Sequence, residues 1–278
     1  MRVIVWMLLL SGVAGAQRRV ERDVVYGRGA GVELKLDVSV PAMPGPHPAV
    51  ILVHGGGWEA GSKDHEWIRP LFAPIERAGW AWFSIDYRLA PAHVWPACLD
   101  DVKQAVRWIR QQAARYGVDP ERLVLAGESA GGHLVNWVGV DPDPGLRVRG
   151  VISFYGISDF VSRYEVHGKQ LAQNARQLLG LGRDAAIDAA ALERMRAASP
   201  IHQVRRGMPP FLLIHGTEDR GVPVEQSTEF CRRIRAAGSR CEVLLVAGAG
   251  HGVSSWEVEE KFRIYQPRMI EWLRREIP

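Results

Sequence analysis

The sequence predicts an α/β protein with a mostly parallel central sheet and helices on both faces. Two patterns carry this prediction: short continuous runs of apolar residues recur along the chain, and amphipathic helical segments separate most of them. Continuous apolar runs are typical of strands buried on both faces of a parallel sheet. Repeated strand–helix units then place helices against both faces.

The first expected strand, residues 32–40, alternates apolar and polar residues and ends at a proline-rich segment, residues 41–48. This pattern predicts an antiparallel hairpin at the sheet edge. The expected parallel strands follow as residues 49–53, 80–85, 123–126, 148–154, 211–214 and 242–246. Ligands of such sheets bind beyond the carboxyl ends of the strands, so functional residues are expected directly after these runs.

Helical periodicity is clearest in residues 101–116, where apolar side chains recur at spacings of three, four and seven. Paired aspartates at its start and Gly117 at its end are typical helix caps. Residues 224–237 and 257–277 repeat the periodicity. We therefore expect a helix in each of these three segments.

One stretch departs from the alternation of strands and helices. Residues 156–210 separate two expected strands and contain helical pieces at residues 170–179 and 184–198. A connection this long usually has structure of its own. We interpret residues 156–205 as a small lid-like insertion; the alternative is a plain crossover helix with a long loop.

The length of 278 residues suits one large domain or two small ones, and we expect a single globular domain over residues 17–278. The formal charge of +4 comes from basic residues scattered along the sequence. Nucleic-acid binders concentrate such charge on one face or tail, so no nucleic-acid partner is expected. Oligomeric state cannot be derived from these patterns, and a monomer or dimer is the default expectation.

The first residues are typical of an export signal. Arg2 precedes an apolar run at residues 3–10, and residues 14–16 fit the small-x-small cleavage pattern. Cleavage after residue 16 would leave Gln17 first in a secreted or periplasmic protein, with no membrane partner afterwards. The alternative is a buried N-terminal strand.

Three cysteines permit one disulfide bridge in an oxidising compartment. Cys231 lies on an expected helix and Cys241 opens the next expected strand, so this pair is favoured over two free thiols. Cys98 is interpreted as a small apolar packing residue.

A candidate nucleophile follows the apolar run at residues 123–126. There the chain continues as Gly-Glu-Ser-Ala-Gly, with Ser129 in the centre. A serine on a sharp strand-to-helix turn is exposed for attack, and small residues at Gly127 and Gly131 let strand and helix approach closely. The alternative is an ordinary strand-to-helix turn.

Two further polar residues follow expected strands, Asp219 after residues 211–214 and His251 after residues 242–246. An imidazole can remove the proton of a serine hydroxyl, and a carboxylate can hold that imidazole in the required orientation. We therefore predict that Ser129, His251 and Asp219 act together. Glu218 is the rival acid, whereas His54 and His215 are rival histidines expected to be structural.

The segment His54-Gly55-Gly56-Gly57-Trp58 follows the expected strand at residues 49–53. Glycines let backbone N–H groups approach a substrate oxygen, and such donors stabilise the charge that develops there. The expected donors are the amides of Gly56, Gly57 and Ala130. A phosphate-binding loop is the alternative, but no Walker lysine follows. Trp58 and Tyr155 are candidate walls of the substrate pocket.

Together with Asp86-Tyr87-Arg88-Leu89-Ala90-Pro91, these motifs resemble the α/β-hydrolase esterases of the hormone-sensitive lipase group. They are still more similar to its bacterial relatives, the carboxylesterases, acetylxylan esterases and feruloyl esterases. The resemblance extends from about Asp23 to the C-terminus. It departs from the group at Glu128, where aspartate is usual, and in lacking N-terminal cap helices.

The resemblance implies an α/β-hydrolase fold and a serine carboxylesterase that forms an acyl-enzyme, with no cofactor or metal. It also implies short-chain acyl esters as substrates, including acetyl or feruloyl groups on plant polysaccharide. The alternatives are a small serine peptidase and a catalytically silent binding module of the same fold. Within the motif, Asp86 and Arg88 are expected to form a buried ion pair that fixes their loop, or else to bind substrate.

Overall fold

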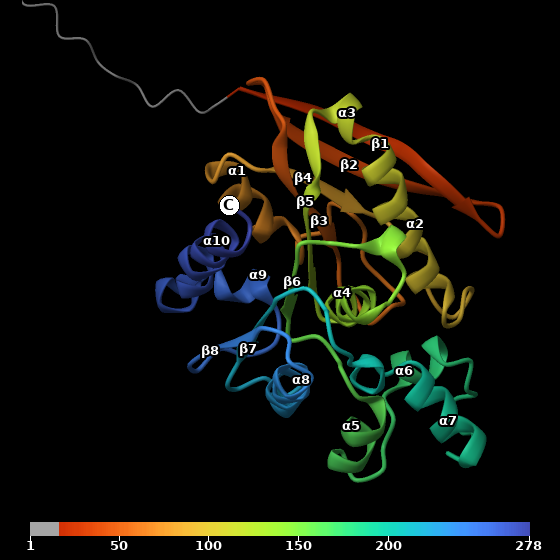
Figure 1. The fold of residues 1–278 in the computed structure, drawn as a ribbon. Helices are drawn as coiled ribbons and strands as arrows, with labels where there is room; N and C mark the ends of the chain where they lie inside the picture. Colours follow the sequence, from red (N-terminus) through yellow and green to blue (C-terminus); the bar gives the residue numbers. More distant parts are fainter. Residues whose placement is uncertain (1–16) are drawn as a thin grey trace, which may run out of the picture.

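The computed structural model describes residues 17–278, and the predicted export signal at residues 1–16 lies outside the described residues. Within the described part, eight strands form one sheet in the order β1-β2-β4-β3-β5-β6-β7-β8 (Figure 1). β2 runs antiparallel to β1 and β4, and the remaining neighbours pair in parallel. The mostly parallel sheet predicted from the apolar runs is therefore confirmed.

The strands are β1 (Arg18–Gly29), β2 (Val32–Pro41), β3 (His47–Val53), β4 (Ala81–Ile85), β5 (Val118–Glu128), β6 (Gly150–Phe154), β7 (Phe211–Gly216) and β8 (Cys241–Val246). The α-helices are α1 (Phe72–Arg77), α2 (Ala97–Gln111), α3 (Ala113–Tyr116), α4 (Ala130–Val140), α5 (Phe160–Val166), α6 (Gln173–Leu178), α7 (Ala189–Ala197), α8 (Glu225–Ala236), α9 (Val253–Trp256) and α10 (Tyr265–Glu276). Short 3-10 helices occur at Arg69–Leu71, Pro144–Leu146, Pro200–Gln203 and Glu260–Ile264.

The sheet buries a separate apolar core on each face. Successive residues of β3 alternate between them: Ile51 packs into the core beside α2 and α4, and Leu52 packs into the core beside α1 and α10. Figure 1 shows these two pairs of helices on opposite sides of the strands. Burying a side chain of this size contributes about 2 kcal/mol, which explains why the central strands are continuously apolar.

The sheet edge carries an antiparallel hairpin, as expected, but residues 32–40 are not its outer strand. Residues 32–40 lie in β2, which is second from the edge, and the edge strand is β1. β1 carries charged side chains such as Arg18, Arg19 and Glu21, and most of its residues are partly or fully exposed. A solvent-facing edge strand gains little from apolar residues, so it carries no continuous apolar run.

The helix expected at residues 101–116 begins earlier and is divided in two. α2 starts at Ala97, so Asp101 does not cap it. Instead, Asp101 is buried and binds the Arg88 guanidinium through both carboxylate oxygens. The expected pairing of Asp86 with Arg88 is therefore wrong, since Asp86 accepts a hydrogen bond from the Lys63 N–H at 2.7 Å. The glycine cap is confirmed, because Gly117 has a φ of 64°.

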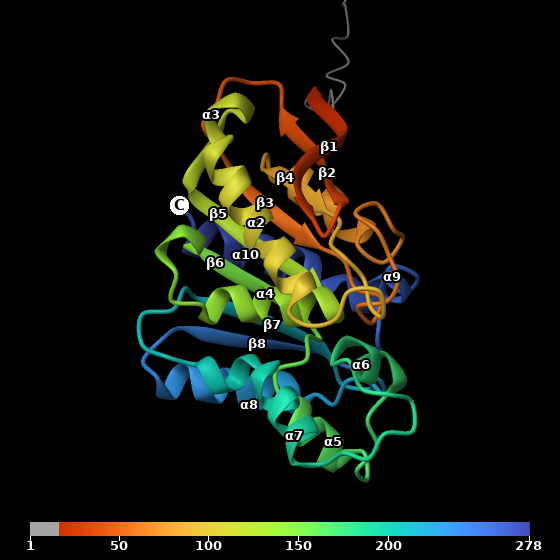
Figure 2. The ribbon, with the colours of Figure 1, turned by 90° about the vertical axis from the view of Figure 1, so that its right-hand side faces the viewer.

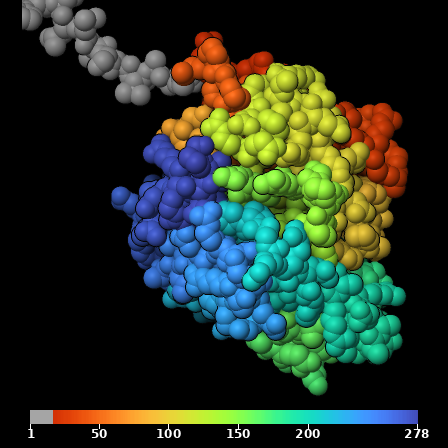
Figure 3. All heavy atoms as spheres, in the orientation of Figure 1, coloured from red at the N-terminus to blue at the C-terminus, as the bar shows by residue number. Residues whose placement is uncertain are grey.

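Residues 156–210, here called the β6–β7 segment, contain α5, α6 and α7. Figures 1 and 2 show these helices grouped at one corner of the molecule, and in Figure 3 they form a lobe of the surface. Backbone hydrogen bonds fix the segment at Ile201, which donates to the Ser158 carbonyl at 3.1 Å, and at Leu178, which accepts from Trp95 at 2.7 Å. α5 was not predicted, because its apolar residues are too few to be recognised as a helical pattern in the sequence.

A disulfide bridge joins Cys231 on α8 to Cys241 on β8. Cys98 is a free, buried thiol, and burial raises its pKa to about 12. Among residues 17–278, none of the helices has the length and apolar character needed to cross a membrane.

Candidate active site

Ser129 lies on the sharp turn between β5 and α4. Its φ of 54° and ψ of −114° are strained for a residue with a side chain, and they direct the hydroxyl out of the sheet edge. A Cβ atom at Gly131 would collide with the Val53 carbonyl, and one at Gly127 would collide with the Gly131 backbone. The predicted close approach of strand and helix at these two glycines is confirmed.

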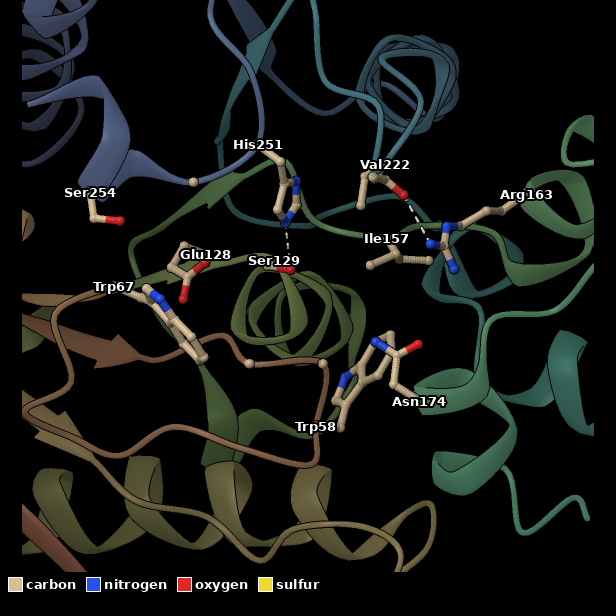
Figure 4. Close-up of a pocket in the computed structure, with 14 residues that line it drawn as sticks. Trp58, Trp67, Glu128, Ser129, Ile157, Arg163, Asn174, Val222, His251 and Ser254 are labelled. Carbon is tan, nitrogen blue, oxygen red and sulfur yellow. Dashed lines mark hydrogen bonds between the residues drawn. The ribbon is translucent and has the colours of Figure 1, made fainter. Parts of the chain in front are cut away.

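Three side chains from three strand ends form one hydrogen-bonded chain. His251 Nε2 lies 3.0 Å from Ser129 Oγ (Figure 4), and His251 Nδ1 lies 2.7 Å from Asp219 Oδ2. Because an ionised carboxylate only accepts, the Nδ1 nitrogen carries the proton and Nε2 is free to accept from the serine hydroxyl. The structure thus brings together all three residues predicted to act as nucleophile, base and orienting acid.

Asp219 is held in its ionised form. Burial acts to raise its pKa, but hydrogen bonds from His215 and His251 outweigh burial and place the pKa well below the usual range. The other carboxylate oxygen, Oδ1, accepts from the Gly221 and Val222 amides at 2.8 Å each. These contacts fix the carboxylate in position against the imidazole.

The rival residues occupy other positions. Glu218 is exposed, whereas the Asp219 side chain is fully buried. His215 is buried between Ser227 Oγ and the Val222 carbonyl. His54 is buried against Gly55 O at 2.7 Å, and burial lowers its pKa to about 4. Both histidines are therefore structural neighbours of the site rather than bases in it.

The glycine-rich loop after β3 faces the serine. Gly56 and Gly57 have φ values of 99° and 61°, which favour glycine, and both line the same cavity as Ser129. Within residues 17–278, no acceptor is hydrogen-bonded to the Gly56, Gly57 or Ala130 amides. These are the donors expected from the sequence to stabilise a substrate oxyanion.

A cavity of about 410 Å³ opens around Ser129 and His251. This volume lies in the range of small-molecule sites. Its lining residues are Gly56, Gly57, Trp58, Trp67, Glu128, Ser129, Ile157, Arg163, Asn174, Gly221, Val222, His251, Gly252 and Ser254. In the described part of the chain, no group of three or more His, Cys, Asp or Glu side chains is placed to hold a metal ion.

The two expected wall residues have different positions. Trp58 lines the cavity, and its indole N–H donates to His133 Nδ1 at 3.1 Å, while His133 Nε2 contacts the Ala198 carbonyl at 2.8 Å. Tyr155 does not line the cavity, because its side chain is buried beneath it. Its hydroxyl accepts from the Val253 N–H at 2.5 Å and its ring centroid lies 4.5 Å from that of His251. Tyr155 therefore supports the histidine loop.

Glu128, the residue before the serine, is only 4% exposed and lines the cavity. Its carboxylate accepts a hydrogen bond from the Gly55 N–H and so joins the turn of Ser129 to the glycine-rich loop. Burial raises its pKa to about 7, opposed by this hydrogen bond and by the charge of His251. A carboxyl group beside the nucleophile therefore titrates near neutral pH.

The lining residues that the sequence reasoning missed include four with polar or aromatic side chains: Trp67, Arg163, Asn174 and Ser254. None of them lies in a recognised motif or directly after an expected strand. Arg163 and Asn174 belong to α5 and α6, and Figure 4 shows them on the opposite side of Ser129 from Trp67, Glu128 and Ser254. No sequence signal could have found them, since only folding of the β6–β7 segment brings them to the serine.

Known proteins are similar to this chain in sequence. The BD-FAE family model matches residues 36–234. The chain is 39% identical to the esterase LipC of Mycobacterium tuberculosis over 74% of its own length and 53% of LipC. It is 32% identical to the esterase LipQ of the same organism, over 84% of its own length and 58% of LipQ. The chain thus spans little more than half the length of these relatives.

Solved structures share the whole architecture. An esterase from the planctomycete Thermogutta terrifontis, with butyrate bound, superposes with a TM-score of 0.70 at 28% identity, covering 93% of this chain and 94% of that one. A carbohydrate esterase from gut microbiota, in truncated form, superposes with a TM-score of 0.76 at 24% identity, covering 95% and 98% of the two chains. This second likeness concerns the fold alone.

Proposed function

The chain belongs to the BD-FAE family of α/β-hydrolases, and we propose that it is a serine carboxylesterase. One observation carries the proposal: the Ser129–His251–Asp219 hydrogen-bonded chain opens into a cavity that the glycine-rich loop also lines. A serine, an oriented imidazole and free backbone donors are together what acyl transfer requires.

The proposed reaction has two halves. Ser129 Oγ attacks the ester carbonyl carbon while His251 Nε2 takes its proton, and the Gly56, Gly57 and Ala130 amides receive the oxyanion. Collapse of this intermediate breaks the bond to the alcohol oxygen, which leaves with the proton from His251. Water then attacks the acyl-enzyme by the same route and releases the carboxylic acid and Ser129.

We propose short-chain acyl esters as the substrate class. The cavity of about 410 Å³ fits a small acyl group, and solved structures of the similar Thermogutta terrifontis esterase carry butyrate or propionate. Acetyl and feruloyl groups on plant polysaccharide belong to the proposal through the sequence resemblance. A screen of p-nitrophenyl esters of increasing chain length beside acetylated and feruloylated xylan ranks these candidates.

We also propose that the enzyme acts in a secreted or periplasmic setting. The signal-like residues 1–16 support this, and so does the Cys231–Cys241 bridge, because disulfides persist in oxidising compartments. Expression of the full chain in an exporting bacterium, followed by mass spectrometry of the product, tests it. Export predicts a mature protein that begins at Gln17, whereas a full-length cytoplasmic product contradicts it.

A fluorophosphonate probe tests the enzymatic proposal, because it labels only an activated serine. We expect labelling of Ser129 and turnover of p-nitrophenyl acetate, with both lost in Ser129→Ala and turnover reduced at least about 10⁴-fold. Ser239→Ala, remote from the cavity, is the matched control and should behave as wild type. Absence of labelling in the wild type would identify a binding module, and faster cleavage of a matched p-nitroanilide than of the ester would identify a peptidase.

A further inference from the structure

Arg163 brings a positive charge to the cavity that no carboxylate neutralises directly. Its Nη2 donates to the Gly221 carbonyl at 2.9 Å. Among residues 17–278, its buried Nε has no hydrogen-bond partner, and Arg163 forms no ion pair. Figure 4 shows the guanidinium at the cavity beside Ile157 and Val222.

The hydrogen bond to the Gly221 carbonyl does not by itself explain why residue 163 is an arginine. One neutral donor would satisfy that carbonyl, whereas a partly buried guanidinium with an unused donor carries a desolvation cost. Burial lowers the pKa of Arg163, although the charge of Asp219 acts to raise it. Asp219 is already committed to His251 and to the Gly221 and Val222 amides, so the guanidinium donors that face the cavity are left for a ligand.

Asn174 supplies a second donor. Its Oδ1 accepts from the Ala175 N–H at 2.8 Å, which fixes the amide so that Nδ2 is the free end. A Cβ atom at Gly57 would overlap this Nδ2, so the NH₂ group lies directly against the glycine-rich loop. Both donors therefore belong to the β6–β7 segment and face one cavity.

The charges around the cavity select one kind of group. Of the described residues that line it, Arg163 is the only one with a permanent positive charge, and Glu128 lies on the opposite side of Ser129. The planar guanidinium fork matches the two oxygens of a carboxylate. Ile157, 3% exposed, and the buried Val222 flank the guanidinium and exclude water from such a pair.

We propose that Arg163 and Asn174 bind a carboxylate carried by the ester substrate. This inference rests on the proposed ester hydrolysis at Ser129 and narrows its substrate class to esters with a second, anionic end. Half-esters of dicarboxylic acids carry that group on the acyl side, and acylated hydroxy acids or sugar acids carry it on the alcohol side.

Matched ester pairs test the wild-type enzyme. 4-Nitrophenyl hydrogen glutarate against its terminal amide probes the acyl side, and 4-acetoxybenzoate against 4-acetoxybenzamide probes the alcohol side. The selectivity ratio is kcat/KM for the charged ester divided by that for its neutral isostere, each corrected for the hydrolysis rate measured without enzyme. We expect one ratio to be about 10 or more and to fall with added salt. Two ratios at or below one would overturn the proposal.

Variants separate binding from structural support. Arg163→Met and Asn174→Asp should each lower the selectivity ratio about 10-fold or more, and Arg163→Lys should retain part of it. Asn174→Asp keeps the oxygen that accepts from Ala175, so the fold is preserved. Arg183→Met, an exposed charge in the same segment, is the control and should keep the ratio. If Arg163→Met slows both esters in equal proportion, Arg163 only supports the Gly221 loop and the proposal is wrong.

The neutral esters report on the proposed function separately, since their hydrolysis needs no carboxylate site. If no ester is turned over, calorimetric binding of benzoate and benzamide to Ser129→Ala still tests the subsite. Tighter binding of benzoate, lost in Ser129→Ala/Arg163→Met, supports the carboxylate site. Equal binding of the two probes rejects it.

Discussion

The cavity has two walls that are built in different ways. The strand-end wall consists of Gly56, Gly57, Glu128, Ser129 and His251. Glu128 is the last residue of β5, and the others lie on the loops that follow β3, β5 and β8. The β6–β7 wall consists of Ile157, Arg163 and Asn174, which lie in or beside the short helices α5 and α6. The first wall holds the proposed nucleophile, the proposed base and two of the expected oxyanion donors, and the second holds the groups proposed to select the substrate.

The two walls also differ in how their positions are fixed. Ser129 donates its N–H to the Phe154 carbonyl at 2.9 Å, and Tyr155 donates to the Ile214 carbonyl at 2.8 Å, so sheet bonding continues into the strained turns. The β6–β7 wall does not continue the bonding of the sheet; single backbone hydrogen bonds, such as Ile201 to Ser158, and side-chain contacts, such as Arg163 to Gly221, hold it. Placement on strand ends favours the precision that acyl transfer needs, whereas short helices permit variation in selectivity.

Asp219→Asn should give the largest effect and act on all esters alike. The asparagine keeps the oxygen that accepts from Gly221 and Val222, but its NH₂ group cannot accept from His251 Nδ1. The imidazole then loses the required tautomer, and kcat should fall about 10³- to 10⁴-fold with the selectivity ratio unchanged. Steady-state kinetics with Glu218→Gln as control check this, and a larger loss in Glu218→Gln would contradict the assignment.

Gly57→Ala tests the point at which the two walls meet. Gly57 has a φ of 61°, and the new methyl group would overlap the Asn174 amide. We expect kcat/KM for neutral esters to fall about 10- to 100-fold, because displacing an oxyanion donor is costly. Gly117→Ala, at a φ of 64° with open space around it, is the control for backbone strain alone. In an Asn174→Gly background the loss should shrink, and an equal loss in both backgrounds would show that the walls do not touch here.

Glu128→Gln should give the smallest effect, seen in the pH dependence of the selectivity ratio. The pKa of Glu128 is raised to about 7 by burial, so its carboxyl is neutral below that pH and negative above it. Ionisation repels a substrate carboxylate, so the wild-type ratio should fall roughly two- to fivefold from pH 6 to pH 8 at low ionic strength. Changes at His251 enter both rates and cancel in the ratio. Glu128→Gln should give a flat ratio, and a wild-type ratio that is independent of pH would contradict the prediction.

Much of the fold was predictable because strands that are buried on both faces appear in the sequence as continuous apolar runs. The apolar runs identified β3 to β8 to within about two residues, except that β5 begins well before the run at residues 123–126, and Gly117 marked a helix end. β1 was missed because an edge strand needs no apolar run, and the start of α2 was misplaced because Asp101 binds Arg88 instead of capping the helix. Local sequence cannot distinguish these two uses of an aspartate.

The sequence by itself determined which residues stand at the carboxyl ends of the strands, and hence that Ser129, Asp219, His251 and the glycine-rich loop meet. Parallel pairing brings the carboxyl ends of the strands to the same end of the sheet, however the rest of the chain folds. Only the tertiary structure decided that Tyr155 lies beneath the cavity and that Arg163 and Asn174 line it. The positions of these residues depend on how the β6–β7 segment packs against the carboxyl ends of the strands. Such contacts join residues that are distant in sequence, so they leave no periodic pattern in it.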